Sequence, residues 1–307
     1  MTDPVLRLVD IATGQHGAVT PHQANLVGVS QRQLRRRVQS GILDKFGTHV
    51  VRSPFVGTSA LNDLAAFVLD CGRGALASGP TAAALHEFDG FLLAPPFHVT
   101  IPRGRSIDRP GHRLHTTFDL PSVDRTRVAG IPVMTAARNL IDLAKTHPPT
   151  ALTIALDSAL RDQKVTEPQL HRRIAELRSS GRYGIPKLLE VIEGQEIVRG
   201  GHSWLERRFL ELCAESGVPH PNTQVVLTEA RDRIVRVDFE FPGTVVIVEV
   251  LGYRHHRGSR AQLDRDAERL NALVMAGKRP LQFTYDHVTL EGGWVVAQLL
   301  DALHLAA

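Results

Sequence analysis

Two acidic side chains, Asp238 and Glu249, stand on neighbouring strand-like segments in the last third of the chain. Residues 236–241 alternate between polar and apolar side chains, which predicts a half-buried strand. A Pro-Gly turn follows, and then the run Val-Val-Ile-Val at 245–248 predicts a strand covered on both faces, which closes with Glu249, Val250 and Leu251 before Gly252 breaks it. Two neighbouring carboxylates repel each other, and a hard divalent cation with oxygen ligands would relieve that repulsion. The sequence therefore predicts a metal site formed by Asp238 and Glu249.

The same acidic residues also have ordinary structural explanations. Asp238 fits a solvated position on an edge strand, and Glu249 fits a strand end that reaches the surface or pairs with an arginine. Ser203 stands three residues before Glu206 at the start of a predicted helix. That spacing is typical of a capping box, in which the glutamate bonds back to the helix start without any chemistry.

The stretch from about residue 200 to 303 resembles the Vsr-like branch of the PD-(D/E)XK nuclease superfamily. The resemblance rests on the helix that carries Trp204 and Glu206, an Asp on one strand, a Glu near the end of an apolar strand, and then Gly, an aromatic residue and His. It implies a restriction-endonuclease-like α/β/α domain with a mixed sheet, and Mg²⁺ as cofactor, bound by Asp238 and Glu249. The catalytic set that the resemblance implies is Glu206, Asp238, Glu249 and His256.

Two positions depart from the pattern of that family. Leu251 stands where the superfamily usually has Lys and this branch often has Asp, and Gln282 stands where the branch often has Arg. The first change removes a group expected to orient water or to bind metal. Turnover of a phosphodiester substrate is therefore left open. The two histidines after the second strand, His255 and His256, also fit ordinary loop residues.

A second group of candidate residues lies near the N-terminus, in an arginine-rich predicted helix at 31–40. Thr20-Pro21 predicts the start of a short helix, and Ser30 predicts the cap of the next one. Leu34 and Val38 face inward, and a small β-hairpin is predicted before residue 56. Guanidinium and amide donors suit phosphates and base edges, so we predict a winged helix-turn-helix that binds double-stranded DNA. The candidate DNA-binding residues are Gln31, Arg32, Gln33, Arg35, Arg36, Arg37 and Arg52. A basic helical bundle that binds a protein is the alternative.

This N-terminal segment resembles the winged-helix domain of AbiEi-type antitoxins, and the region that follows resembles their companion domain. The resemblance implies a DNA-binding autorepressor of a toxin–antitoxin operon with a cognate toxin encoded nearby. We expect a multidomain α/β protein. Its predicted parts are a winged helix-turn-helix (1–56), an α/β scaffold (57–196) and the endonuclease-like domain (197–307).

Composition narrows the class of protein. The 307 residues are 43% hydrophobic and 22% charged, as in ordinary globular proteins, and the formal net charge is +4. The two cysteines, Cys71 and Cys213, fit buried thiols of a reducing compartment. No secretory signal and no apolar run of membrane-spanning length are visible, so we expect a cytoplasmic protein without a membrane partner.

Two functions remain open at this stage. The first is a DNA-binding protein whose Vsr-like domain hydrolyses DNA with Mg²⁺. The alternative is a catalytically inactive antitoxin that represses its own operon. The retained Asp238 and Glu249 favour the first, and Leu251 favours the second.

Overall fold

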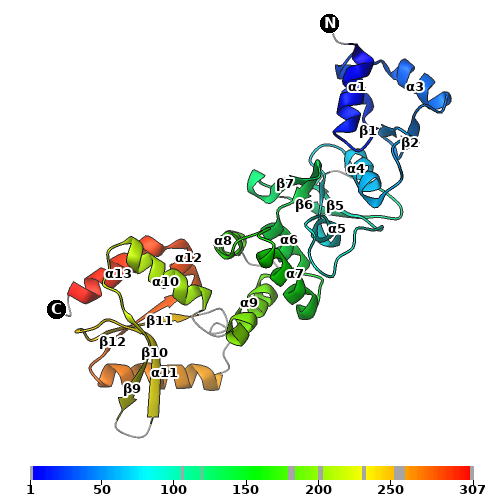
Figure 1. The fold of residues 1–307 in the computed structure, drawn as a ribbon. Helices are drawn as coiled ribbons and strands as arrows, with labels where there is room; N and C mark the ends of the chain where they lie inside the picture. Colours follow the sequence, from blue (N-terminus) through cyan, green and yellow to red (C-terminus); the bar gives the residue numbers. More distant parts are fainter. Residues whose placement is uncertain are drawn as a thin grey trace. The chain divides into compact units, whose positions relative to one another are not determined.

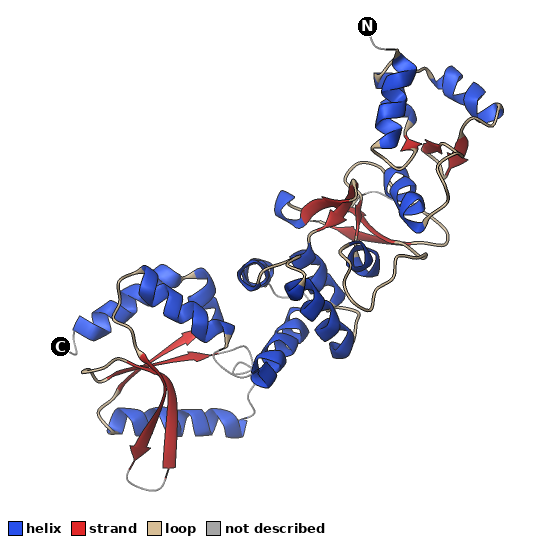
Figure 2. Ribbon diagram, viewed as in Figure 1, coloured by secondary structure: helices blue, strands red, loops and turns tan. Residues whose placement is uncertain are grey.

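The protein is an α/β protein, as predicted, and its computed structural model is shown in Figures 1 and 2. Thirteen α-helices and three sheets lie within the described residues. The chain divides into two compact units, residues 1–166 and 167–307, and each is described by itself. The described residues are 3–104, 107–118, 120–178, 184–199, 203–229, 233–251 and 260–304.

The first part of unit 1 is built from three helices and a three-stranded antiparallel sheet with the order β1-β3-β2. A small core joins them, in which Leu8, Val29 and Leu34 from the helical part pack with Val19 and Val51 of the sheet. The elements are α1 (Pro4–Thr13), β1 (Ala18–Val19), α2 (Pro21–Leu26), α3 (Gln31–Gln39), β2 (Asp44–Phe46) and β3 (Val50–Arg52).

The rest of unit 1 is organised on a five-stranded mixed sheet with the order β6-β5-β4-β8-β7. Helix α4 joins the two sheets, because its Leu64 and Phe67 pack in the core of the larger sheet while Ala66 packs with Ala18 and Val50 of the smaller one. The elements are α4 (Ala60–Asp70), β4 (Leu76–Ala77), α5 (Gly79–Leu85), β5 (His98–Pro102), β6 (Arg113–Thr117), η1 (Ser122–Asp124), β7 (Arg125–Val128), β8 (Ile131–Met134), α6 (Ala136–Leu143) and α7 (Pro149–Arg161).

Unit 2 contains a four-stranded mixed sheet with the order β12-β11-β10-β9, in which β11 and β12 run parallel. The strand predicted to be central, β11, indeed lies between β10 and β12. The elements are α8 (Glu167–Leu177), α9 (Ile185–Arg199), α10 (Trp204–Glu215), β9 (Asn222–Glu229), β10 (Arg233–Glu240), β11 (Val246–Leu251), α11 (Arg260–Met275), β12 (Arg279–Thr284), α12 (Tyr285–Leu290) and α13 (Gly292–His304).

Helices cover both faces of the four-stranded sheet (Figure 1). On one face, Leu273 of α11 packs with Val237 and Ile247. On the other, Phe209 of α10 lies with its ring centroid 4.6 Å from that of Phe239. The sheet and its two helical layers thus form an α/β/α arrangement. Both cysteines, predicted as buried thiols, are free and buried, and burial raises the pKa of Cys213 to about 12.

Helix α8 is attached to the rest of unit 2 through a buried histidine. The Nδ1 atom of His171 lies 2.6 Å from the hydroxyl oxygen of Tyr285, and its ring stacks on Trp204 with centroids 3.7 Å apart. Burial, and then the nearby Arg207 guanidinium, lower the pKa of His171 to about 3. The folded protein therefore holds this imidazole neutral.

We expect acid to destabilise unit 2 through His171. The unfolded chain takes up a proton near pH 6.5 and the folded chain does not, so stability falls as pH drops below 6.5 toward the folded pKa of about 3. Between pH ~6.5 and pH ~5 the contribution of His171 alone is expected to fall by about 2 kcal/mol. Urea unfolding followed by tryptophan fluorescence measures it, because the two tryptophans, Trp204 and Trp294, both belong to this unit.

The control for this expectation is a pair of histidine substitutions. The wild type should lose about 2 kcal/mol relative to His171→Gln between pH ~6.5 and pH ~5, and His220→Gln, at an exposed position, should keep the pH dependence of the wild type. A His171→Gln protein that keeps the full pH dependence would assign the effect to another group.

Candidate nucleic-acid interface and carboxylate cluster

Helix α3 is started by a turn and a capping box that the local sequence encodes. Gly28 adopts a φ of 92°, a conformation that glycine reaches without strain. The Ser30 side chain then accepts from the backbone N–H of Gln33, and the Gln33 side chain accepts in return from the backbone N–H of Ser30 at 2.7 Å. Leu34 is 3% exposed and anchors the helix to the small core.

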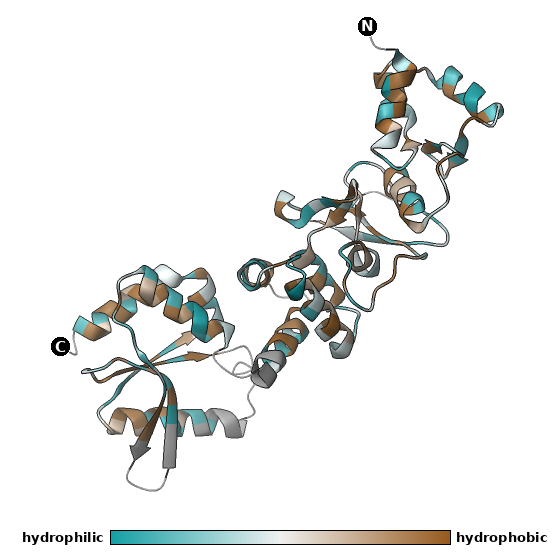
Figure 3. Ribbon diagram, in the orientation of Figure 1, coloured by the Kyte–Doolittle hydropathy of each residue, from teal (hydrophilic) through white to brown (hydrophobic). Residues whose placement is uncertain are grey.

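The outer face of α3 is cationic, and no acidic side chain in the described part of the chain forms an ion pair with its exposed arginines. Arg32, Arg35 and Arg36 are exposed, and no acidic residue lies in the helix. Among the described residues, none of these three arginines forms a salt bridge, whereas Arg208 of α10 contacts two glutamates. Figure 3 shows α3 as a hydrophilic stretch of the ribbon. Such guanidinium groups are free to pair with phosphates in the bidentate manner typical of arginine.

Three of the predicted DNA-binding residues are engaged within the protein instead. The Gln33 side chain completes the capping box. A guanidinium N–H of Arg37 donates to the backbone carbonyl of Gln33 at 3.3 Å. Arg52 pairs with Asp63 at 2.5 Å and lies over the ring of Phe46. Gln31, Arg32, Arg35 and Arg36 therefore form the solvent-facing part of the predicted set.

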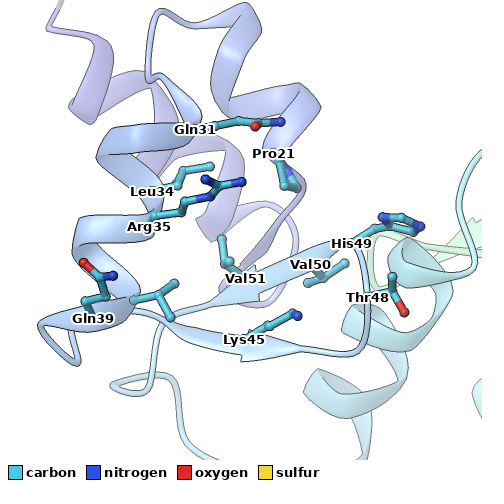
Figure 4. Close-up of a pocket in the computed structure, with 11 residues that line it drawn as sticks. Pro21, Gln31, Leu34, Arg35, Gln39, Lys45, Thr48, His49, Val50 and Val51 are labelled. Carbon is cyan, nitrogen blue, oxygen red and sulfur yellow. The ribbon is translucent and has the colours of Figure 1, made fainter.

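A groove lies between α3 and the β2–β3 hairpin, with a volume of about 490 Å³ (Figure 4). Polar groups come from both sides of it. Gln31, Arg35 and Gln39 belong to α3, and Lys45 and His49 belong to the hairpin. The remaining lining residues are Pro21, Leu34, Val38, Thr48, Val50 and Val51. The groove thus combines an apolar lining with cations and amide donors on its two walls.

The second candidate site lies where β10 and β11 separate. The backbones of the two strands pair at Glu240 with Ile247 and at Phe239 with Val248. Beyond this pair, the backbone N–H of Val250 donates to the Asp238 carboxylate at 2.9 Å. The β9–β10 ladder also skips Asp238, opposite Gln224, whose φ is 53°. The two residues that flank Asp238 pack on opposite faces of the sheet, one against α11 and the other against α10. The predicted strict alternation of side chains between the two faces is therefore wrong at Asp238.

The other two predicted acidic residues have close protein partners. Glu249 is 5% exposed and lies inside β11, which ends at Leu251 as expected from the glycine that follows. Its Oε1 lies 2.5 Å from an Arg269 nitrogen, and its Oε2 accepts from the Gln282 amide at 3.1 Å. Oε1 accepts no hydrogen bond of good geometry. Its contact with Arg269 is therefore an ion pair without a well-directed hydrogen bond.

Glu206 realises only part of the predicted capping box. Ser203 accepts from the backbone N–H of Glu206 at 3.2 Å, as expected for a helix cap. The Glu206 carboxylate, however, accepts from the side-chain amide of Gln224 at 2.9 Å. Glu206 thus faces the same strands as Asp238 and Glu249.

The charges of Glu206 and Glu249 both act on Asp238. Burial raises the pKa of Asp238 to about 6. The Val250 N–H opposes this shift, and the charges of Glu206 and Glu249 add to it. Since the folded state favours the neutral acid, it binds more protons than the unfolded state between the ordinary pKa of 3.8 and about 6. Stability contributed by Asp238 is therefore lost as pH rises through that window.

Asp238→Asn is expected to stabilise unit 2 at neutral and alkaline pH. The amide oxygen still accepts from Val250, and the cost of ionising a buried acid disappears. We expect an increase of about 1 to 3 kcal/mol in the free energy of unfolding at pH ~8, and almost none at pH ~4. Urea unfolding followed by tryptophan fluorescence measures both. Asp301→Asn, at an exposed position, is the control. An equal effect of Asp238→Asn at both pH values would contradict this reasoning.

The donor set of this cluster does not fit a divalent cation. Among the described residues, no three His, Cys, Asp or Glu side chains are arranged to hold a metal ion. The Arg269 guanidinium already lies against Glu249, and Leu251 adds no ligand. A second cation there would meet the charge of Arg269. The Mg²⁺ site remains a prediction, and His255 and His256 lie outside the described residues.

Sequence reasoning missed the partners that neutralise the cluster. Arg269 lies on α11, 20 positions after Glu249, and Gln224 lies on β9, 18 positions after Glu206. Neither spacing is a local signal. The one available hint was the general expectation that a buried glutamate pairs with an arginine. No helix among the described residues is long and apolar enough to cross a membrane.

Comparison with known proteins gives one family match. A family model described as "AbiEi antitoxin C-terminal domain" matches residues 81–191. No curated protein matches the chain.

Among solved structures, the crystal structure of the RV2827C protein from Mycobacterium tuberculosis is similar at 14% identity and a TM-score of 0.42. The match covers 65% of this chain and 80% of that one. The family match is the finding that bears on function: residues 81–191 of this chain are similar to the C-terminal domain of AbiEi antitoxins.

Proposed function

We propose that the protein is a DNA-binding antitoxin that represses transcription of its own operon. The N-terminal 56 residues act as a winged helix-turn-helix, with α3 as the recognition helix and the β2–β3 hairpin as the wing. The similarity of residues 81–191 to an antitoxin domain supports this function over nuclease activity. The protein would work in the cytoplasm, where its operon is transcribed.

The observation that carries the DNA-binding role is the uncompensated cationic face of α3. By contrast, Arg161 on α7 is paired with Asp89 and Asp162. Arg32, Arg35 and Arg36 are exposed on one short helix that has no acidic residue. Phosphate contacts from such a face give affinity that falls with salt, and Gln31 adds an amide suited to base edges.

In this proposal the carboxylate cluster of unit 2 has a structural role. Arg269 and Gln282 contact Glu249, Gln224 contacts Glu206, and Val250 donates to Asp238. Each acid therefore has a partner within the same sheet and helix layers. The domain then serves as a contact surface for DNA or for a cognate toxin encoded nearby.

A reporter gene placed behind the DNA that precedes the protein's own coding sequence tests the repression. Wild-type protein is expected to lower reporter expression, and the variant with Arg32→Ala and Arg36→Ala is expected to restore it. Equal expression with and without the wild-type protein would refute autorepression. Rescue of growth from the neighbouring toxin by co-expression tests the antitoxin role separately.

Hydrolysis of DNA is the second candidate function, and the observation that favours it is that Glu206, Asp238 and Glu249 all lie at one sheet, in contact with or within β9, β10 and β11. Incubation of supercoiled plasmid with Mg²⁺ or Mn²⁺ tests it directly. Cleavage by the wild type that disappears in the variant with Asp238→Ala and Glu249→Ala would establish the enzyme. The antitoxin proposal expects no cleavage by either protein.

A further inference from the structure

A buried carboxylate outside both candidate sites holds the turn of the β2–β3 hairpin. Asp70, at the C-terminal end of α4, is 1% exposed. Its Oδ1 accepts from the backbone N–H groups of Thr48 at 2.8 Å and His49 at 2.5 Å. Its Oδ2 accepts from the Nε of Arg109 at 2.5 Å, and another N–H of Arg109 donates to the Asp70 carbonyl at 3.1 Å.

The backbone of the hairpin turn at Gly47 lies directly against the Asp70 carboxylate. A Cβ added to Gly47 would lie 2.3 Å from an Asp70 oxygen, and the φ of Gly47 is 58°. Only glycine combines that conformation with so close an approach. A buried charge with two backbone donors and one guanidinium partner is strongly localised, since loss of any partner leaves desolvated charge behind.

Asp70 also joins the hairpin to the larger sheet. Helix α4 packs its Phe67 into the core of the five-stranded sheet, and Arg109 lies in the connection between β5 and β6. The hairpin turn is thereby fixed to two parts of unit 1 that lie outside the DNA-binding segment. A winged helix with a free wing would need none of these contacts.

The groove beside α3 depends on where the hairpin stands. Lys45, Thr48 and His49 line the hairpin side, and Gln31, Arg35 and Gln39 line the helix side (Figure 4). Thr48 and His49 are the residues whose backbone Asp70 holds. Asp70 does not line the groove, but it holds the hairpin that carries Lys45. It therefore fixes the position of Lys45 relative to Arg35.

We propose that Asp70, with Arg109, is a positioning residue for DNA binding: it holds the hairpin so that Lys45 and the cations of α3 engage phosphates of the same duplex. The proposal rests on the DNA-binding function proposed above. Asp70 itself makes no contact with DNA, because its carboxylate is buried and fully engaged. Asp70 changes the affinity for DNA only by fixing the position of Lys45.

A double-mutant cycle between Asp70→Asn and Lys45→Ala tests this coupling. The dissociation constant is measured for the full chain on the duplex that precedes its own coding sequence, across a series of salt concentrations. Lys45→Ala is expected to weaken binding about tenfold and to reduce the salt slope by about 0.9, the value for one phosphate contact. Asp70→Asn is expected to produce the same loss, and the double variant no further loss.

Full additivity of the two changes would overturn the proposal, because a residue that only stabilises the fold does not erase the contribution of Lys45. Wild-type affinity in folded Asp70→Asn would overturn it as well. Arg109→Gln breaks the same pair from the other side and serves where Asp70→Asn fails to fold. It is expected to show the same reduced salt slope, and an unchanged slope would overturn the proposal.

Failure of the underlying function has a different signature. If wild-type protein does not bind the duplex, or if substitutions on α3 leave binding unchanged, DNA recognition by this unit is refuted together with the role of Asp70. If α3 substitutions weaken binding and the Asp70–Lys45 cycle is additive, only the positioning role is refuted.

Discussion

Replacing Arg35 and Arg36 together by alanine is expected to weaken binding to duplex DNA about a hundredfold. Each exposed guanidinium is expected to contribute about 1.4 kcal/mol as a hydrogen bond to a charged phosphate, and the two sum to about 2.8 kcal/mol. The change should also reduce the slope of log K against log salt by about 1.8, because two phosphate contacts are lost. Fluorescence anisotropy at several salt concentrations measures both quantities.

The matched control removes the same charge from another part of the chain. Arg161 and Arg172 are exposed on α7 and α8, and their double alanine variant also lowers the net charge by two. It is expected to bind DNA nearly as well as the wild type. An equal loss in both double variants would show that binding follows net charge alone and that α3 has no special part in it.

Asp124→Ala is expected to destabilise unit 1 by about 3 to 5 kcal/mol, the range for breaking a buried ion pair. Asp124 is 0% exposed, and its carboxylate accepts from Arg138 at 2.5 Å. Arg138 is itself buried, and its remaining ion pair among the described residues is the longer contact with Asp142 at 3.3 Å. Removing Asp124 therefore leaves a desolvated guanidinium, with a loss near the lower end of the range because Asp142 remains.

Thermal unfolding followed by far-ultraviolet circular dichroism measures this loss, since both tryptophans lie in the other unit. Asp89→Ala is the control. Asp89 pairs with Arg161 at the surface, where a pair contributes about 0 to 1 kcal/mol. A small effect of Asp124→Ala, equal to that of Asp89→Ala, would show that the buried pair is not required for the fold of unit 1.

Local signals predicted much of this structure. The helix expected at 31–40 is α3 at Gln31–Gln39, begun by the expected Ser30 cap. The short helix expected to start at Thr20-Pro21 is α2, with Thr20 as its cap, and the small hairpin expected before residue 56 is formed by β2 and β3. These elements follow from caps, turns and hydrophobic periodicity within a few residues. The serine–glutamine spacing at Ser30 and Gln33 was also a readable sign that Gln33 is used in the cap.

The parts that sequence reasoning missed depend on contacts between distant residues. Arg52 was predicted to contact DNA, and in the structure it pairs with Asp63. Glu249 was predicted to bind a metal near the end of its strand, and in the structure its carboxylate lies against Arg269. Asp70 drew no attention because it is an unremarkable residue of an amphipathic helix. Its partners come from a hairpin and a loop that only the folded chain brings together.

Binding of wild-type protein to the duplex that precedes its own coding sequence, measured against salt concentration, tests most directly whether the arginine face of α3 binds DNA. We predict that the protein binds this duplex saturably, and more tightly than it binds an unrelated duplex of equal length. We also predict that affinity falls linearly on a logarithmic plot with a slope of about −3, from three or more phosphate contacts at about 0.9 each. Affinity that is absent, or that does not change with salt, would contradict a DNA-binding role for the arginine face of α3.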